Sequence, residues 1–162
     1  MNNRLHNGGA IIVLSFIVAY MLTAMPLPDW AVNWRPAWVS IVLIYWCLAI
    51  PDRVGIGIAW TLGLLLDVQQ GTVFGQHAVT LTIMAYIIIK LHQRIRVFPL
   101  VQQAMLVCLL LLLAQLLTLW IRAMMGIPPQ HWTYWTPALT SMVIWPWLFI
   151  ILRDVRRKFH VF

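Results

Sequence analysis

The chain has 162 residues, of which 62% are hydrophobic and only 9% are charged, and its formal net charge is +7. A mean hydropathy of +0.86 is more than one soluble core needs, so the composition indicates an integral membrane protein. The basic residues are confined to short breaks between apolar runs, which argues against a nucleic-acid-binding surface. Cys47 and Cys108 both lie inside apolar runs, so we expect packing residues rather than a disulfide.

The first apolar run covers residues 9–25 and follows a polar start. It ends in Pro26-Leu27-Pro28-Asp29 without a small-residue cleavage site, so we expect a retained membrane span rather than a signal peptide. The second run, 36–50, begins with Pro36 and ends before Pro51. Proline is tolerated in the first turn of a helix, which predicts a second helical span there.

The third span, 54–67, contains small residues and ends in an acidic one. Gly55, Gly57 and Gly63 lie among bulky apolar residues, and such small residues let a second helix approach closely in a membrane. We expect this helix to end at Asp67, because Gly71 and Gly75 bracket a polar turn in which glycine supplies positive φ angles.

Three further apolar runs, 77–91, 101–121 and 137–152, complete a predicted all-α membrane domain of six helices over residues 1–162. The third and fourth runs, 54–67 and 77–91, are short for a bilayer, which predicts either helices partly buried among their neighbours or a locally thinner membrane. The last run contains Trp145-Pro146-Trp147. We expect Pro146 to break and kink the helix, with the two tryptophans forming either a surface for a partner helix or lipid chain, or ordinary packing.

Six spans place both termini on one side of the membrane, and the basic residues decide which side. Nine of the eleven lysines and arginines fall on the side of the termini, and short basic loops stay in the cytoplasm. The nine are Arg4, Arg53, Lys90, Arg94, Arg96, Arg153, Arg156, Arg157 and Lys158. The opposite loops, 26–35, 68–76 and 126–136, carry an interfacial set of aromatics, namely Trp30, Trp34, Trp132, Tyr134 and Trp135.

Two charged residues lie at the predicted outer boundary. Arg35 begins the second span and Asp67 ends the third. Asp67 is either retained for a function, since a charge within hydrocarbon is costly, or it caps nearby free amides of residues 69–71. Arg35 either pairs with Asp67 or extends to the lipid headgroups.

No catalytic or metal-binding pattern is present. The chain has no Glu, and its four aspartates are scattered over both sides of the membrane, which disfavours paired-carboxylate chemistry. The motifs CxxC, HExxH and GxxxxGK[ST] are absent, and none of the five histidines has a second ligand at helical spacing. We therefore expect no enzyme, no cofactor and no metal.

Several motifs in order resemble the MreD family of rod shape-determining membrane proteins, in its gammaproteobacterial form. They run over nearly the whole chain, and it is their order and spacing that make the resemblance specific. The motifs are Arg35-Pro36-Ala37-Trp38, Tyr45-Trp46, Pro51-x-Arg53-Val54-Gly55, Gly63-x-x-x-Asp67-x-x-x-Gly71-x-x-x-Gly75, Trp145-Pro146-Trp147 and Arg153-x-Val155-Arg156.

The resemblance implies a non-enzymatic scaffold of the cell-elongation complex in the bacterial inner membrane. Members of the family work with MreC, with MreB, with RodA and with its class B penicillin-binding transpeptidase in peptidoglycan synthesis. Their fold is said to be similar to that of the substrate-binding subunits of energy-coupling-factor transporters. An outer cavity near Arg35 and Asp67 would then hold a lipid or a partner's segment.

Two functional hypotheses follow. In the first, apolar faces dock the membrane helix of an MreC-like partner, while the inward loops and basic tail contact cytoplasmic partners or anionic lipid. In the second, the chain is a solute- or lipid-binding subunit of a membrane transporter that uses the outer cavity. The candidate interaction or cavity residues are Arg35, Asp67, Gly71, Gly75, Trp145, Pro146 and Trp147.

Overall fold

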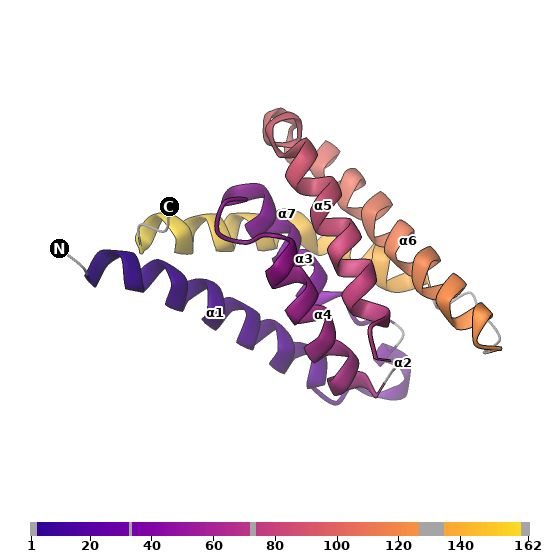
Figure 1. The fold of residues 1–162 in the computed structure, drawn as a ribbon. Coiled ribbons are helices and arrows are strands. Elements are labelled where there is room, and N and C mark those ends of the chain that lie inside the picture. Colours follow the sequence, from indigo (N-terminus) through magenta and orange to yellow (C-terminus); the bar gives the residue numbers. More distant parts are fainter. Residues whose placement is uncertain (1–2, 33, 72–73, 127–134, 160–162) are drawn as a thin grey trace.

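The computed structural model describes residues 3–32, 34–71, 74–126 and 135–159, and this part of the chain is helical with no strand. Helices pack side by side in an elongated bundle (Figure 1). Their bounds are α1 Asn3–Ala24, α2 Asp29–Val32, α3 Trp38–Ala49, α4 Ile56–Gln70, α5 Gln76–Val97, α6 Leu100–Met124 and α7 Thr136–Lys158.

Each of the six predicted apolar runs lies mainly within one helix, and the short α2 was not predicted. Two expectations were wrong, namely that the third span ends at Asp67 and that Pro146 breaks the sixth. α4 continues for three residues beyond Asp67 to Gln70, where Gly71 ends it in the left-handed conformation. α7 continues without interruption through Pro146, because a proline removes only one amide donor and the remaining hydrogen bonds of the helix hold.

The centre of the bundle is α3, which contacts α1, α5, α6 and α7. Nine of its 12 residues are buried, so this short helix lies inside the protein rather than against the surroundings. Its aromatic residues tie it to its neighbours. The rings of Tyr45 and Phe149 meet edge to face with centroids 5.5 Å apart, and Nε1 of Trp46 donates to Oγ of Ser15 at 2.8 Å.

α4 and α5 form the most extensive helix pair. Gly63 lies directly against the backbone of His77 and Ala78 at the start of α5, and a Cβ atom at position 63 would overlap that backbone. The small-residue prediction is therefore confirmed at Gly63. Gly55 and Gly57 have no such neighbour within 4 Å.

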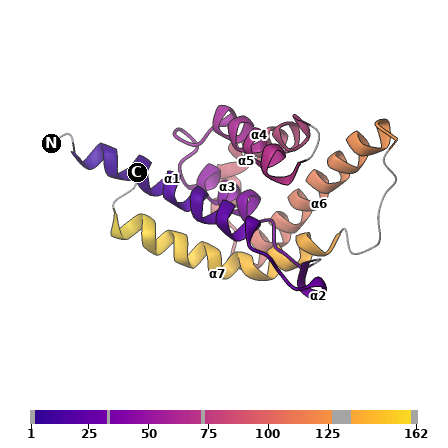
Figure 2. The same cartoon turned by 90° about the horizontal axis from the view of Figure 1, so that it is seen from below.

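The start of α1 and the end of α7 lie toward the same end of the bundle, and α2 and the end of α6 lie toward the other (Figures 1 and 2). Among the described helices, α5, α6 and α7 are long and apolar enough to cross a membrane, and residues 8–24 and 38–49 form shorter apolar helices. Trp30, within α2, and Trp34, just after it, are exposed, whereas Trp132 and Tyr134 of the predicted aromatic set lie outside the described residues.

Candidate functional site

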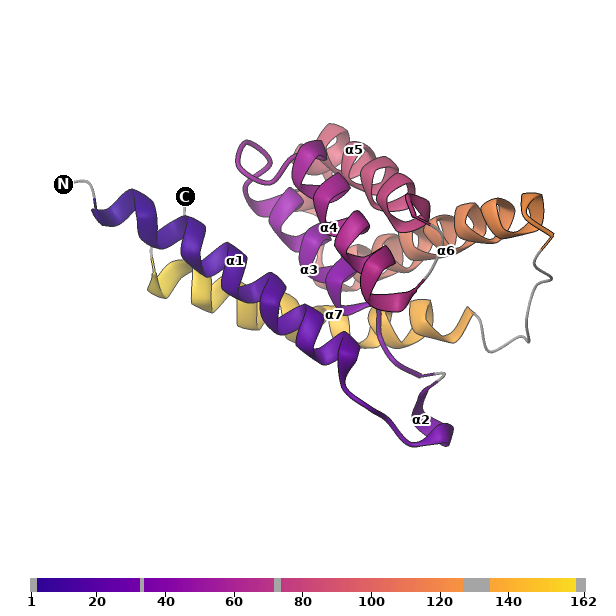
Figure 3. The same ribbon diagram turned by 60° about the horizontal axis from the view of Figure 1, so that its bottom comes forward.

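A cavity of about 450 Å³ opens at the end of the bundle that carries α2. We call it the Arg35 cavity. Figure 3 shows the segments that surround it, where α1 ends, α3 begins and α4 turns into α5. Each of the described helices contributes to its lining, and the short α2 contributes only Val32. The lining includes Thr23, Arg35, Val39, Leu66, Gln70, His77, Thr80, Leu81, Leu111, Gln115, Thr118, Arg122 and Pro137.

The lining of the Arg35 cavity is amphipathic. Leu66, Leu81 and Leu111 supply apolar surface, while the guanidinium groups of Arg35 and Arg122 supply two positive charges. Such a combination suits a ligand or peptide segment with an apolar body and an anionic or hydrogen-bonding group.

Arg35 fastens the end of α1. Its Nη1 donates to the carbonyl of Thr23 at 2.6 Å, and its Nη2 donates to the carbonyl of Met25. Carbonyls at a helix C-terminus have no partner within the helix, and a cation there also interacts favourably with the helix dipole. The pairing of Arg35 with Asp67 that the sequence suggested is replaced by these contacts, because the described ion pair of Asp67 is with His77.

Asp67 is 1% exposed and binds the first turn of α5. Its Oδ2 accepts from the amide of Gly75 at 2.9 Å, and its Oδ1 accepts from the amide of His77 at 2.9 Å. These amides belong to the start of a helix, where donors lack intrahelical acceptors and a negative charge is stabilised. Asp67 is thus a cap, but of the next helix rather than of the amides of residues 69–71.

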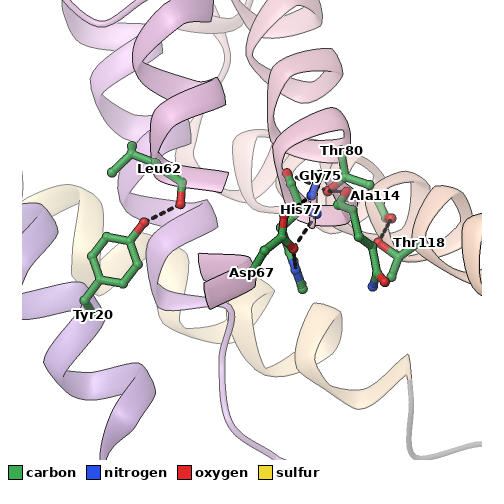
Figure 4. Close-up of polar contacts among 9 residues, drawn as sticks. Tyr20, Leu62, Asp67, Gly75, His77, Thr80, Ala114 and Thr118 are labelled. Carbon is green, nitrogen blue, oxygen red and sulfur yellow. Dashed lines mark hydrogen bonds and ion pairs between the residues drawn. The ribbon is translucent and has the colours of Figure 1, made fainter. Parts of the chain in front are cut away.

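His77 is the residue that the sequence did not bring to notice. Its Nδ1 lies 2.7 Å from Oδ1 of Asp67, within hydrogen-bonding distance, and an Nδ1–H there would donate to the carboxylate. The side chain of His77 is 19% exposed while that of Asp67 is fully buried, and the imidazole borders the Arg35 cavity. The buried Asp67 thereby orients the imidazole of His77, which lines the cavity; Figure 4 shows this contact.

Gly71 and Gly75 set the geometry that makes this contact possible. Their φ angles are +65° and +100°, a region that side-chain-bearing residues rarely adopt. Gly71 ends α4 and Gly75 begins α5, so the turn returns the chain onto α4 and aims the first amides of α5 at Asp67. The predicted positive φ angles are confirmed.

A second set of contacts ties α1 to α4 beside the cavity. The hydroxyl of Tyr20 donates to the carbonyl of Leu62, and Nε2 of Gln69 donates to the carbonyl of Tyr20 at 3.1 Å. Figure 4 shows Tyr20 reaching from α1 to α4 on one side of Asp67, with Thr80 and Thr118 on the other.

Trp145, Pro146 and Trp147 lie apart from the Arg35 cavity, on α7. Trp145 is 0% exposed and Trp147 is 71% exposed, so neighbouring residues point to opposite environments. Trp145 packs beside Phe149, with ring centroids 6.0 Å apart. The two tryptophans therefore do not form one common surface: Trp145 belongs to the core, and Trp147 is open to lipid or a partner.

Within the described ranges, no three His, Cys, Asp or Glu side chains gather as they would around a metal ion. The Arg35 cavity has a mixed polar and apolar lining. It presents cationic donors, amide and hydroxyl groups and one oriented imidazole over an apolar base.

Comparison with known proteins adds one consistent result. Residues 5–155 match the sequence model of the family described as rod shape-determining protein MreD. The chain is 36% identical over 143 residues to a Haemophilus influenzae protein described as rod shape-determining protein MreD, and the match covers 88% of both chains. No solved structure matches the chain.

Proposed function

Because the chain belongs to the MreD family of rod shape-determining proteins, we propose that it is a non-enzymatic membrane scaffold of the complex that elongates rod-shaped bacterial cells. The observation that carries this proposal is the family match, which extends over residues 5–155. The cavity's binding-type lining agrees with a scaffold rather than with catalysis.

In the proposed arrangement, α1 and α3–α7 form one domain over residues 1–162 and cross the inner membrane six times, with both termini in the cytoplasm. Three helices have the length and hydropathy for this. α3 has 12 residues and rises about 18 Å, which is less than the thickness of the hydrocarbon layer. Its neighbours bury it, so in this arrangement it contacts protein rather than lipid. The positive-inside rule orients the bundle, since nine of the eleven basic residues lie at the ends assigned to the cytoplasm.

The membrane helix of an MreC-like partner docks, in this proposal, on an exposed apolar helix face. One such face runs along α7 at intervals of four residues, through Leu139, Val143, Trp147 and Ile151, each 49–71% exposed. Apolar exposure alone suits lipid equally well, but an aromatic side chain on such a face adds a large rigid contact area for a partner. MreB, RodA and its class B penicillin-binding transpeptidase join the same complex.

The Arg35 cavity is the second proposed contact, open to the periplasm. It receives a membrane-proximal segment of the partner or a lipid, with Arg35 as a cationic contact. Asp67, Gly71 and Gly75 hold the turn that forms part of its wall. In this role Asp67 acts through His77 and the turn rather than by touching the partner.

Affinity purification of the tagged chain in mild detergent, followed by mass spectrometry of proteins and small molecules, tests the scaffold. We expect an MreC-like protein and wall synthases to be recovered. Gly71→Leu and Gly75→Leu should reduce that recovery, because leucine disfavours the positive φ angles at both positions. Unchanged recovery with both variants would remove the turn from the proposed docking site.

A solute- or lipid-binding transport subunit is the alternative function, and the size of the Arg35 cavity favours it. About 450 Å³ falls within the usual range of small-molecule sites, and this reading goes with the proposed likeness to the substrate-binding subunits of energy-coupling-factor transporters. It predicts that the purification yields a stoichiometric small molecule and an ATPase module instead of wall synthases.

A further inference from the structure

A second cavity, of about 620 Å³, lies at the opposite end of the bundle from the Arg35 cavity, where α3 ends. We call it the Arg156 pocket. It is formed by the residues that follow α3, by the last turns of α5 and by the end of α7. Its charged and titratable lining consists of Asp52, His92, Arg96 and Arg156.

Arg156 lines the pocket, whereas Arg157 and Lys158 do not. On α7 it continues the stripe of Trp145, Phe149 and Leu152, spaced by three and four residues, which packs on the core. Arg156 is accordingly half-buried, whereas Arg157 and Lys158 are exposed. The last turn of α7 therefore contributes one cation to the pocket and leaves two outside it.

In the described part of the chain, Arg156 forms no salt bridge with a carboxylate. Nε and Nη2 of Arg96 donate to the carbonyls of Leu48 and Ala49, at 2.8 and 2.6 Å, and so fasten the end of α3. Nδ1 of His92 lies 2.5 Å from the carbonyl of Ile89. The ion pairs of the described chain are His77 with Asp67 and Arg153 with Asp154, so Asp52 and Arg156 line one pocket without pairing.

The balance of charge in the pocket is positive. Two guanidinium groups and one carboxylate leave a net charge of +1 with His92 neutral, and one monoanionic group would neutralise it. In the proposed orientation the pocket lies at the cytoplasmic boundary, where phospholipid phosphates are the abundant anions and where basic pockets between helices bind them. The inference rests on that orientation but not on the identity of the protein partner.

We propose that the Arg156 pocket binds the phosphodiester headgroup of an anionic inner-leaflet phospholipid. Arg156 supplies the unpaired fork of donors for the phosphate oxygens. Asp52 accepts from a headgroup hydroxyl, which makes a glycerol headgroup a better fit than one with only a quaternary ammonium. The lipid would then hold together the ends of α3, α5 and α7, which all border the pocket.

Native mass spectrometry of the delipidated full chain, titrated with phosphatidylglycerol or with phosphatidylcholine of the same acyl chains, tests this. We expect phosphatidylglycerol to bind more tightly, and Arg156→Gln to weaken that binding about fivefold. Arg157→Gln is the matched control, because it removes the same charge from the adjacent exposed position. Arg156→Lys should restore part of the affinity, which separates loss of charge from a folding defect.

If Arg156→Gln and Arg157→Gln weakened phosphatidylglycerol binding equally, the pocket assignment would be overturned. The lipid would then be attracted to the basic tail as a whole. Inorganic phosphate that stabilises the chain as well as phosphatidylglycerol does, at matched ionic strength, would overturn the lipid assignment. A loss of partner recovery in Arg156→Gln alone, with lipid binding intact, would assign the pocket to an acidic protein segment instead. Partner recovery by the unmutated chain is scored in the same preparations, so failure of the scaffold is seen separately from failure of the lipid site.

Discussion

Oδ1 of Asp67 lies 2.7 Å from Nδ1 of His77 and 2.9 Å from the amide of the same residue. One carboxylate thus binds both the backbone and the side chain at the start of the next helix. Because Asp67 is buried, replacing it should leave amide donors of α5 without an equally good acceptor.

Asp67→Asn is expected to lower the free energy of unfolding by about 1–3 kcal/mol, because the asparagine amide has fewer acceptor sites and no charge. Thermal unfolding in detergent, followed by tryptophan fluorescence, measures the change. Asp154→Asn is the control, since Asp154 is 66% exposed and 3.9 Å from its partner Arg153. Equal midpoints for the two variants would contradict the capping role of Asp67.

Gly63→Ala should destabilise the α4–α5 pair, because the added methyl group overlaps the backbone of α5. Overpacking of this kind costs about 1–3 kcal/mol. Gly57→Ala makes the same chemical change on the same helix, where nothing lies within 4 Å, and alanine favours the helix. We expect a lower unfolding midpoint for Gly63→Ala and an equal or higher one for Gly57→Ala.

Trp145→Ala and Trp147→Ala separate a core role from a surface role at two positions on either side of Pro146. Trp145 is 0% exposed, and emptying such a site costs about 3–5 kcal/mol. Trp147 is 71% exposed, so its removal should leave the unfolding midpoint nearly unchanged. Reduced recovery of the MreC-like partner by Trp147→Ala, at normal stability, would place the partner on this face of α7, and full recovery would exclude Trp147 from the contact.

Arg35→Gln should destabilise the end of α1 by about 1 kcal/mol, because a cation that binds free carbonyls at a helix C-terminus is lost. Arg122→Gln removes a second charge from the Arg35 cavity, but the structure describes no side-chain hydrogen bond from Arg122. We expect its stability to change by less than about 0.5 kcal/mol. If partner recovery falls equally in both variants, the cavity's charge matters for binding beyond the capping of α1.

The proposed orientation predicts which positions react from outside the cell. Trp30 lies within α2 and is 79% exposed. A cysteine that replaces it should react with a membrane-impermeant maleimide in spheroplasts. Cysteine at Arg94, in the last turn of α5, should react only after lysis. Cys47 and Cys108 are buried, so the unmutated chain is the background control, and the opposite labelling pattern would invert the topology.

The six helices other than α2 were predictable because each contains a separate apolar run, but the contact between Asp67 and His77 was not. Asp67 and His77 are ten residues apart on different helices, and the turn that brings them together has positive φ angles at Gly71 and Gly75. A pattern of apolar residues carries no information about such a turn. From the sequence, Arg35 was expected either to pair with Asp67 or to extend to the lipid headgroups, whereas its side chain donates to the carbonyls of Thr23 and Met25.

Pro146 and its flanking tryptophans show a second limit of prediction from the sequence. The helix around Pro146 continues, since packing and the other hydrogen bonds outweigh one missing donor, and local sequence rules do not include that packing. The direction of each tryptophan depends on which face of α7 meets α3, and only the three-dimensional arrangement fixes it. The signal available beforehand was periodicity: Trp145 lies seven residues before Leu152 and on the same face.

The Arg35 cavity and the Arg156 pocket lie at the two ends of the same short helix, since one is lined by residues 36–40 and the other by residues 49–52. In the proposed orientation, water that enters both hollows is separated by α3, which rises only about 18 Å, whereas the hydrocarbon layer is about 30 Å thick. In that case the transmembrane voltage would fall mainly along α3. A charged group that enters the Arg35 cavity would be held at the edge of a focused electric field.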